Sequence, residues 1–348
     1  MFKYLKNILG VKSRKKYNFF RINRILGDWQ PYSGSKCIKD TKLPKYLDLP
    51  KDVEKWGDYS GQVPLSTVIF PYWLRLSSEI AGFLVKQVNS GKLYNDIEIP
   101  REGKDPRKIS SPHPLLKFFQ RRILTRLLEQ MEVHPAAHGF IKNRSIFTAL
   151  EKHTGKRVVI SLDIRDFFDT ITFKRVCGLF KGYGIKEDKA LLLAGLCCRN
   201  GRLPQGAPTS PMISNLICKK MDSRLTGLAE KNGFSYTRYA DDLIFSGGEN
   251  ILKFLPIIKQ IIKEEGFTPA EEKTKIRRSG SRQQVLGLNV NSKVSVPKKV
   301  RRLIRAMVHR QALSEGRNHE MLSFLYGHIA FMSNKHPEQA EKLKRQLI

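Results

Sequence analysis

Cysteine is scarce in this sequence, and no two cysteines have the C-x-x-C spacing of a zinc-binding or redox pair. The chain has five, which are Cys37, Cys177, Cys197, Cys198 and Cys218. This odd number indicates neither a disulfide framework nor a zinc site, and it is typical of a reducing compartment, here expected to be the cytoplasm. Long apolar runs are missing as well. The best of them, Leu191 to Cys198, is far shorter than the roughly 20 residues that cross a bilayer, so we expect no membrane partner.

Acidic residues are few for a chain of this size. The 348 residues include 63 Lys and Arg but only 32 Asp and Glu, which gives a formal charge of +31. A field of that size attracts polyanions, and nucleic acid is the leading candidate. An acidic protein or a membrane surface is the alternative that charge alone leaves open. Because hydrophobic residues make up 41% of the chain, we expect a folded globular protein.

The spacing of apolar residues predicts an α+β fold with a helical appendage. Helices are expected over 65–88, 115–131 and 251–265, and strands over 95–110 (strand, turn, strand), 157–164, 234–248 (a hairpin) and 284–291. A long helix is expected to begin at Ser210 and to end at Gly233, with a stripe formed by Ile213, Ile217, Met221, Leu225 and Leu228.

Both ends of the chain are basic. Residues 1–60 are expected to form an arm that packs on the domain or on RNA, with a targeting or membrane-surface helix as the alternative. After Pro297 the pattern predicts a small module of helices, with new helices opening at Asn318 and Pro337.

Three aspartates occupy positions where a sheet can present carboxylates at fixed geometry. Asp163 ends a buried strand, and Asp241 and Asp242 lie at the turn of a hairpin. Taken separately, each would be an ordinary cap or turn residue. Together, flanking a Gly/Pro-rich loop and a helix in a basic protein, they suit two Mg²⁺ ions that assist an in-line phosphoryl transfer.

Several segments resemble, in the same order, the motifs of reverse transcriptases, and of their bacterial branch in particular. They are RKISSPHPLLKFFQRRIL (107–124), HGFIKNRSIFTA (138–149), SLDIRDFFDTI (161–171), LPQGAPTSPMISNLI (203–217), YADD (239–242), EKTKI (272–276), QVLGLNVN (284–291) and GHIAFMSNKHPE (327–338). The resemblance implies a right-hand polymerase. It would have a basic extension (1–60), fingers with parts of the palm (61–160), a palm with a small antiparallel sheet, flanking helices and the catalytic centre (161–291), and a helical thumb (292–348).

The resemblance also implies residue roles. Asp163, Asp241 and Asp242, with the backbone of Ile164, would hold two Mg²⁺ ions, and Mn²⁺ is the expected substitute. The incoming dNTP would be bound by Arg101, Arg107, Gln205 and Lys273 and by the segment Arg165, Asp166, Phe167 and Phe168, largely through its backbone amides. Phe168 would disfavour a 2′-hydroxyl, and Lys273 would protonate pyrophosphate. For the arginines and Lys273 an exposed side chain with no role is the alternative, and for Phe167 and Phe168 it is ordinary core.

Primer and template would be contacted by Asn143, Arg144, Gly206, Tyr239, Ala240 and Gly287, and the thumb would grip an RNA–DNA hybrid through its phosphates. Length and motifs resemble retron reverse transcriptases most. That subfamily implies a structured RNA as template and primer, a branched RNA–DNA product, a role in antiphage defence, and an effector or toxin protein as a further partner. Two departures are the retron VTG triplet, which reads Val285-Leu286-Gly287, and the NAxxH pattern, which TALEKH (148–153) only approximates. The alternatives are another compact bacterial defence reverse transcriptase, a nucleic-acid scaffold with incidental catalysis, and an RNA-dependent RNA polymerase.

Overall fold

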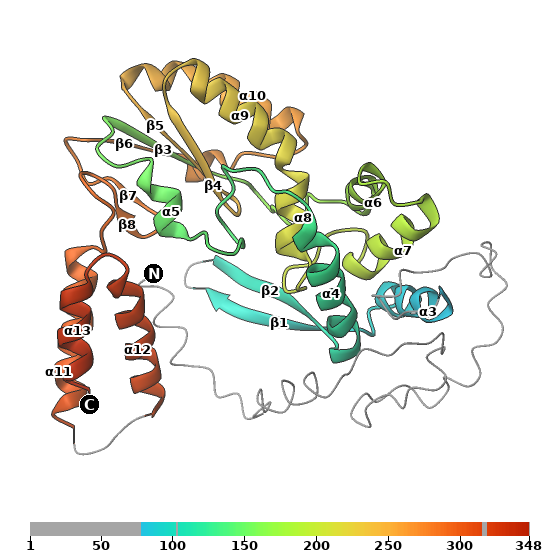
Figure 1. The fold of residues 1–348 in the computed structure, drawn as a ribbon, viewed down its shortest axis with the longest axis horizontal. Coiled ribbons are helices and arrows are strands. Elements are labelled where there is room, and N and C mark those ends of the chain that lie inside the picture. Colours follow the sequence, from blue (N-terminus) through green and yellow to red (C-terminus); the bar gives the residue numbers. More distant parts are fainter. Residues whose placement is uncertain (1–77, 102–103, 315–318, 348) are drawn as a thin grey trace. The chain divides into compact units, whose positions relative to one another are not determined.

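The structure is a computed structural model, and it describes residues 78–101, 104–314 and 319–347. The predicted basic extension at 1–60 and the first part of the helical pattern at 65–88 lie outside these residues. The chain divides into two compact units, drawn in Figure 1. The first holds the described residues up to Gln130 together with Thr172–Ser210, and the second holds Met131–Ile171 and the chain from Pro211 onward. The predicted boundaries of fingers, palm and thumb stay predictions.

The first unit is a β-hairpin with four helices. It contains α3 (Ser78–Asn89), β1 (Tyr94–Arg101), β2 (Lys104–Pro112), α4 (Pro114–Arg126), α6 (Phe173–Gly182), α7 (Glu187–Cys197) and a short 3-10 turn at Leu128–Gln130. The strand–turn–strand prediction for 95–110 is confirmed by the antiparallel pairing of β1 with β2. Proline at the first turn of α4 suits a helix start, and the side chain of His113 accepts a hydrogen bond from the amide of Leu115.

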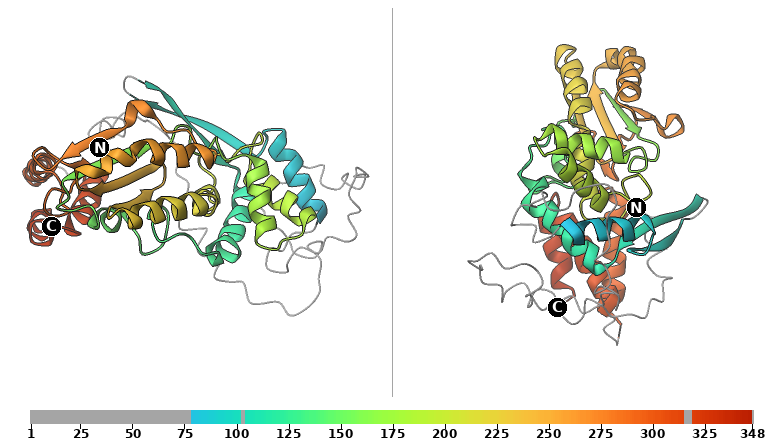
Figure 2. Two further views of the ribbon diagram at one scale, coloured as in Figure 1. Left: turned by 90° about the horizontal axis from the view of Figure 1, so that it is seen from above. Right: turned by 90° about the vertical axis from the view of Figure 1, so that its right-hand side faces the viewer.

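The second unit is built on a four-stranded antiparallel sheet with the strand order β4-β5-β3-β6. The strands are β3 (Val158–Asp163), β4 (Ser235–Tyr239), β5 (Asp242–Gly247) and β6 (Lys275–Arg278). The predicted buried strand and the predicted hairpin are therefore confirmed. Two helices, α9 (Lys219–Lys231) and α10 (Leu255–Glu264), run side by side along the sheet (Figures 1 and 2). The expected helix at 251–265 begins as a 3-10 turn at Glu249–Phe254.

Two predicted elements are wrong in detail. The single helix expected from Ser210 to Gly233 is divided at Cys218 into α8 (Ser210–Ile217) and α9. The strand expected at 284–291 is a two-stranded hairpin, β7 (Gln284–Val285) and β8 (Leu288–Asn289). Its turn places Leu286 at φ 48° and Gly287 at φ 83°, so the chain reverses where a continuous strand was predicted.

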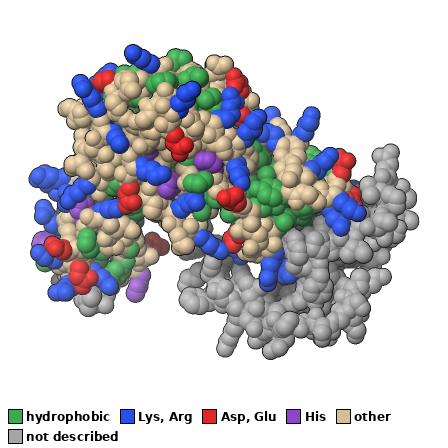
Figure 3. All heavy atoms as spheres, turned by 45° about the horizontal axis from the view of Figure 1, so that its top comes forward, with side chains coloured by type: hydrophobic (Ala, Val, Ile, Leu, Met, Phe, Trp, Pro, Cys, Tyr) green, Lys and Arg blue, Asp and Glu red, His purple; other side chains and the backbone are tan. Residues whose placement is uncertain are grey.

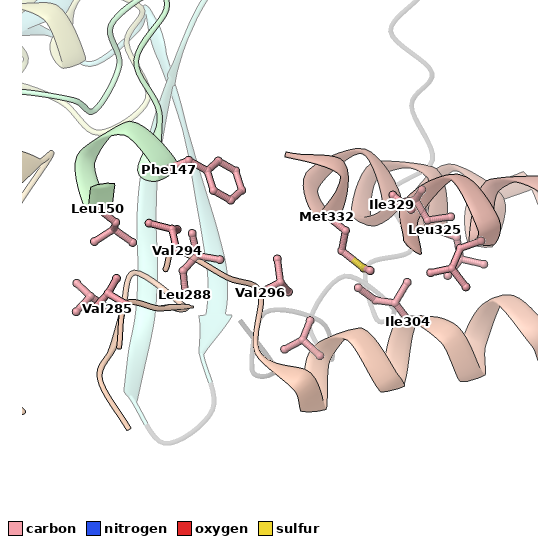
Figure 4. Packing of buried hydrophobic residues seen from close by; sticks show 14 of the residues in the cluster. Phe147, Leu150, Val285, Leu288, Val294, Val296, Ile304, Leu325, Ile329 and Met332 are labelled. Carbon is pink, nitrogen blue, oxygen red and sulfur yellow. The ribbon is translucent and has the colours of Figure 1, made fainter. Parts of the chain in front are cut away.

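The C-terminal helices share a hydrophobic core with the hairpin. They are α11 (Lys298–Ala312), α12 (His319–Ser333) and α13 (Pro337–Arg345). Figure 4 shows side chains from α5 (Ile146–Glu151), from the hairpin segment and from α11 and α12 in one cluster, including Phe147, Leu288, Val296, Ile304 and Met332. Among the described residues, no helix is both long and apolar enough to span a membrane.

Candidate active site

Two of the predicted catalytic aspartates lie opposite one another on neighbouring strands. The register of β3 with β5 pairs Asp163 with Asp242. Directly opposite residues of an antiparallel pair leave the sheet on the same face, with Cβ atoms about 5 Å apart. Asp241 comes from the adjoining turn, and its carbonyl accepts a hydrogen bond from the amide of Ile164 (N···O 3.0 Å). The structure therefore brings all three predicted aspartates to one end of the sheet, where β3 ends and β5 begins.

The turn that carries Asp241 is shaped by small residues. Tyr239 pairs with Asp242 across the turn, and Ala240 between them has a left-handed backbone (φ 57°). Gly139 lies against this turn, since a Cβ atom added to it would stand only 2.7 Å from the backbone nitrogen of Ala240. A glycine is required there because no side chain fits.

A buried ion pair holds the turn that carries Asp241 in position. The guanidinium of Arg238, on β4, donates to both carboxylate oxygens of Asp222 on α9 (2.8 and 2.7 Å), and both side chains are fully buried. The same guanidinium donates to the carbonyl oxygen of Ala240 (3.0 Å). It also donates to the side-chain oxygen of Asn215 (3.0 Å), whose amide group donates to the carbonyl of Gly139 (2.8 Å). The position of the turn that carries Asp241 thus depends on a charge pair that was not predicted from the sequence.

Signals for this pair were present in the sequence. Arg238 is a charged residue inside an otherwise uncharged strand, directly before the YADD motif, and Asp222 follows Met221 of the predicted apolar stripe. A charge placed among buried positions needs a partner of opposite sign. Tyr236, two residues before Arg238, donates its hydroxyl to Asp222 as well (2.7 Å).

The carboxylates repel one another. Burial, followed by the negative charges of Asp241 and Asp163, raises the pKa of Asp242 to about 7. The ammonium group of Lys273 donates to a carboxylate oxygen of Asp163 (2.7 Å) and so already offsets part of this charge. Within the described part of the chain, no three His, Cys, Asp or Glu side chains stand close enough together to hold a metal ion. The donor set nevertheless fits a hard divalent cation, because it consists of carboxylate oxygens and crowds like charges that such a cation neutralises.

The segment after Asp163 is held by its backbone. The amide of Ile164 donates to Asp241, as described, and the amide of Arg165 donates to the carbonyl of Thr268 (2.8 Å). Of the backbone amides in this segment that were predicted to donate to the triphosphate, those of Asp166 to Phe168 therefore remain as candidates. Asp166 has a left-handed backbone (φ 47°) and an exposed side chain.

The side chains of this segment differ in their surroundings. Phe167 is buried against Phe267, with ring centroids 5.8 Å apart. Its side chain is therefore part of the core. Phe168 is only half-buried and touches the edge of the Phe167 ring. The guanidinium of Arg165 pairs with Glu272 (2.8 Å).

In the first unit, the structure brings Arg107 and Gln205 together. The guanidinium of Arg107, on β2, donates to the side-chain oxygen of Gln205 (3.0 Å), and the amide of Ser110 donates to the Gln205 carbonyl (2.7 Å). Gly206 follows with φ 121°, and a Cβ atom on it would stand 2.5 Å from the carbonyl oxygen of Ser110. The glycine therefore lets the loop lie on the strand. Arg101 lies two residues beyond Ile99, the residue opposite Arg107, and it stands opposite Lys104 next to the hairpin turn.

The start of this loop is anchored by Arg199. Its guanidinium pairs with the carboxylate of Asp96 on β1 and donates to the hydroxyl of Ser110 on β2 (2.7 Å). The hydrogen bonds to Arg199 and Ser110 hold the pKa of the Asp96 carboxyl below its usual range. Both contacts tie the loop that carries Gln205 to the hairpin that carries Arg107.

Comparison with known proteins gives the family. The family model described as reverse transcriptase (RNA-dependent DNA polymerase) matches residues 99–290, more than half of the chain. This chain belongs to the reverse transcriptase family. The matched span runs from the end of β1 to the β7–β8 hairpin and includes the three aspartates, Arg107 and Gln205.

Several relatives of this reverse transcriptase are retron enzymes. It is 37% identical over 273 residues to the retron Mx65 reverse transcriptase of Myxococcus xanthus, covering 73% of this chain and 64% of that protein. To the retron Mx162 enzyme of the same organism it is 36% identical, covering 75% and 62%. To the retron Ec86 enzyme of Escherichia coli it is 33% identical, covering 68% and 74%. The resemblance to retron-like bacterial reverse transcriptases is confirmed, although the chain spans less than two thirds of the two Myxococcus proteins.

The two finger residues predicted to touch template have different surroundings. Arg144 donates from one guanidinium nitrogen to the carbonyl oxygens of His134 (3.0 Å) and Ala137 (2.5 Å), so it shapes its own loop. Asn143 is exposed and has a left-handed backbone (φ 63°). Template contact by either side chain stays a prediction.

His153, the histidine of the approximate NAxxH pattern, is a buried connection within the sheet of this reverse transcriptase. Its two ring nitrogens hydrogen-bond the hydroxyls of Ser246 on β5 (2.7 Å) and Thr237 on β4 (2.8 Å). Burial, followed by the positive charges of His138, Lys152 and Lys156, lowers its pKa to about 3. The ring is therefore neutral in the folded protein at neutral pH.

This histidine predicts a pH dependence of stability. An unfolded histidine has a pKa near 6.5, so between about pH 6.5 and the folded value the unfolded state binds more protons and the native state loses stability as pH falls. We expect His153 to contribute a loss of up to about 1.4 kcal/mol per pH unit in that window. Urea unfolding of the unaltered chain and of His153→Gln from pH 7.5 to 4.5 measures this loss. The free energy of unfolding should depend less steeply on pH in His153→Gln than in the unaltered chain, whereas the exposed-site variant His309→Gln should keep the steeper dependence. Equal slopes in all three proteins would refute the role of His153 in this pH dependence.

Proposed function

We propose that this chain is an RNA-directed DNA polymerase that extends a primer on a structured RNA template by two-metal phosphoryl transfer. The pairing of Asp163 with Asp242 beside Asp241 carries the proposal, because it brings three aspartates to the same end of the sheet. Family membership and the net charge of +31 support a nucleic-acid substrate. On the face drawn in Figure 3, Lys and Arg side chains are spread widely, which suits contacts to phosphates along a duplex.

We assign proposed roles to residues at and near the three aspartates, Asp163, Asp241 and Asp242. Two Mg²⁺ ions, or Mn²⁺ in their place, would be held by Asp163, Asp241, Asp242 and the Ile164 carbonyl and would lower the pKa of the primer hydroxyl. Lys273, which donates to Asp163, would give a proton to the departing pyrophosphate. The amides of Asp166 to Phe168 would donate to the triphosphate.

The first unit has proposed tasks of its own. Arg107 and Gln205 would bind the incoming dNTP, and the planar guanidinium of Arg107 suits phosphate oxygens. Arg101 would be a second phosphate contact. Gly206 would allow close approach of the loop backbone to the nascent base pair, as it already does to Ser110.

Primer extension tests the proposal. The purified chain is given a DNA primer annealed to an RNA template, with dNTPs or rNTPs, in Mg²⁺, in Mn²⁺ or in EDTA. We expect extension by dNTPs in either metal and none in EDTA. No extension on any primed template would refute the proposal, and extension by rNTPs equal to that by dNTPs would favour an RNA polymerase.

Phe168 should control the choice of sugar. Its half-buried ring follows the strand that ends at Asp163, and removing it would open space beside the 2′ position of the nucleotide. We expect Phe168→Ala to lower the dNTP-over-rNTP preference in kcat/KM by on the order of 10- to 100-fold. Competitive single-nucleotide extension measures it. The control is Phe118→Ala, which removes an exposed aromatic ring of the first unit and should leave the preference unchanged. An unchanged preference in Phe168→Ala would mean that Phe168 only packs against its neighbours.

We further propose that the enzyme serves a retron, makes a branched RNA–DNA hybrid from a dedicated structured RNA, and acts in antiphage defence with an effector or toxin protein. The retron reverse transcriptases among its relatives support this. Sequencing the nucleic acid that copurifies with the chain tests it. A short DNA joined to a structured RNA is expected, and bulk cellular RNA would favour another class of bacterial reverse transcriptase.

A further inference from the structure

Phe140 has an unusual combination of backbone and exposure. Its backbone is left-handed (φ 64°), which is costly for a bulky residue, and 48% of its surface is exposed. Single exposed hydrophobic residues are common on protein surfaces and need no explanation by themselves. Among the described exposed large hydrophobics, however, Phe140 alone also has a positive φ. Neither core packing nor local backbone preference accounts for an aromatic residue in this position.

The residues before Phe140 are held firmly in place. The segment runs beside β4, with the amide of His138 donating to the carbonyl of Arg238 (2.7 Å). Gly139 is fixed by the hydrogen bond from Asn215 (2.8 Å) and by its close approach to Ala240. The Phe140 ring is therefore presented by a preformed backbone.

The loop after Phe140 is held as well. Its turn is closed by a hydrogen bond from the amide of Arg144 to the carbonyl of Ile141 (3.2 Å), and Arg144 binds the carbonyls on the other side of the segment. Strain of this kind persists only where the surrounding contacts impose it, and it concentrates at ligand-binding sites.

The ring stands beside the catalytic turn. Its centroid lies 6.5 Å from that of Tyr239, with the two planes tilted by 35°. This separation is near the outer limit for an aromatic pair, so the rings do not cover one another, and Tyr239 is itself partly exposed. Exposed Lys142 and Asn143 follow two and three residues later in the chain. Exposed aromatic rings, with a cation and a polar side chain nearby in the chain, are features of surfaces that bind nucleic-acid bases by stacking.

We propose that Phe140 and Tyr239 form a stacking surface for a nucleobase of the bound template–primer at the catalytic turn. The inference rests on the proposed function, which supplies the nucleic acid. Stacking tolerates any base, because every base has a flat π-face, so the surface would hold the strand without selecting its sequence. Because Gly139 contacts Ala240, the position of the base would be tied to that of Asp241 and Asp242.

Crosslinking and binding in EDTA test the inference without polymerisation. The probes are RNA template–DNA primer duplexes with 5-iodouracil placed in turn at the primer terminus, at its paired template base and at the first unpaired template base. We expect ultraviolet light to crosslink one of these positions to Phe140 or Tyr239, identified by mass spectrometry of the peptides. Phe140→Ala should lose the Phe140 crosslink and bind the duplex about 5- to 150-fold more weakly, as measured by fluorescence anisotropy.

Two further variants separate binding from folding. Phe140→Gly relieves the left-handed strain, so it should unfold at the same or a higher temperature while binding as weakly as Phe140→Ala. Phe118→Ala, the matched exposed aromatic, should bind and crosslink as the unaltered chain does. Unchanged affinity in both Phe140 variants, or binding by the unaltered chain with no crosslink to Phe140 or Tyr239, would overturn the inference alone. Failure of the unaltered chain to bind any of the duplexes would overturn the proposed function and the inference with it.

Discussion

Asp241→Asn is expected to reduce dNTP incorporation on a primed RNA template by about 10³-fold or more. The amide keeps the shape of the side chain but loses the negative charge that would hold Mg²⁺, and loss of metal assistance costs several kcal/mol in the transition state. Single-turnover extension measures the rate. Folding should be preserved, since the change also removes part of the repulsion that raises the pKa of Asp242. The melting temperature of the variant should therefore equal or exceed that of the unaltered chain.

The control for this experiment is Glu230→Gln, which removes the same charge from an exposed position on α9. It should leave the rate of extension unchanged. If Asp241→Asn retained a tenth or more of the original rate, the triad would not be the catalytic centre, and a scaffold with incidental catalysis would become the better description.

Arg238→Met is expected to lower the free energy of unfolding by about 3–5 kcal/mol. Removing the guanidinium leaves the carboxylate of Asp222 buried without its charged partner, which is among the most destabilising single changes known for a protein interior. Urea unfolding followed by circular dichroism measures the loss. A loss below about 1 kcal/mol would mean that the pair contributes little to folding.

The double variant Arg238→Met with Asp222→Leu distinguishes stability from positioning. Apolar side chains of similar size often replace a buried ion pair with little net cost, so much of the lost stability should return. The carbonyl of Ala240 and the side chain of Asn215 would still lack their donor, however. We expect the double variant to remain slow in extension and to need more Mg²⁺ for half-maximal rate. A fully active double variant would restrict Arg238 to a role in folding.

The sequence predicted the end of the sheet that carries the three aspartates better than it predicted the interactions that hold this end in place. Asp163 could be placed because it follows an apolar, β-branched strand, and the YADD turn because it joins two short strands. Their pairing then follows from the register of β3 with β5. The link between Arg238 and Asp222 has no such periodic signal, since it joins a strand to a helix through side chains whose burial depends on the whole fold.

The errors in secondary structure have similar causes. The division at Cys218 interrupts an apolar stripe that continues at helical spacing, with no proline or glycine at that point to mark it. The turn at Leu286 requires a left-handed backbone from a branched residue, which local preference argues against. Strand β6, with the sequence KIRR, has no apolar alternation because, among the described strands, it is an edge strand that pairs with β3 alone.

The strand order has a consequence for how the protein is made. Strand β3 is central, yet both of its neighbours, β5 and β6, come later in the chain, after the excursion through Thr172–Ser210 that belongs to the other unit. At the roughly 5–20 residues per second of synthesis, the backbone N–H and C=O groups along its two edges wait several seconds for the hairpin that begins at Ser235. A nascent chain therefore lacks the pairing that brings Asp163 opposite Asp242, and β3 is open to mispairing until translation has passed Arg278.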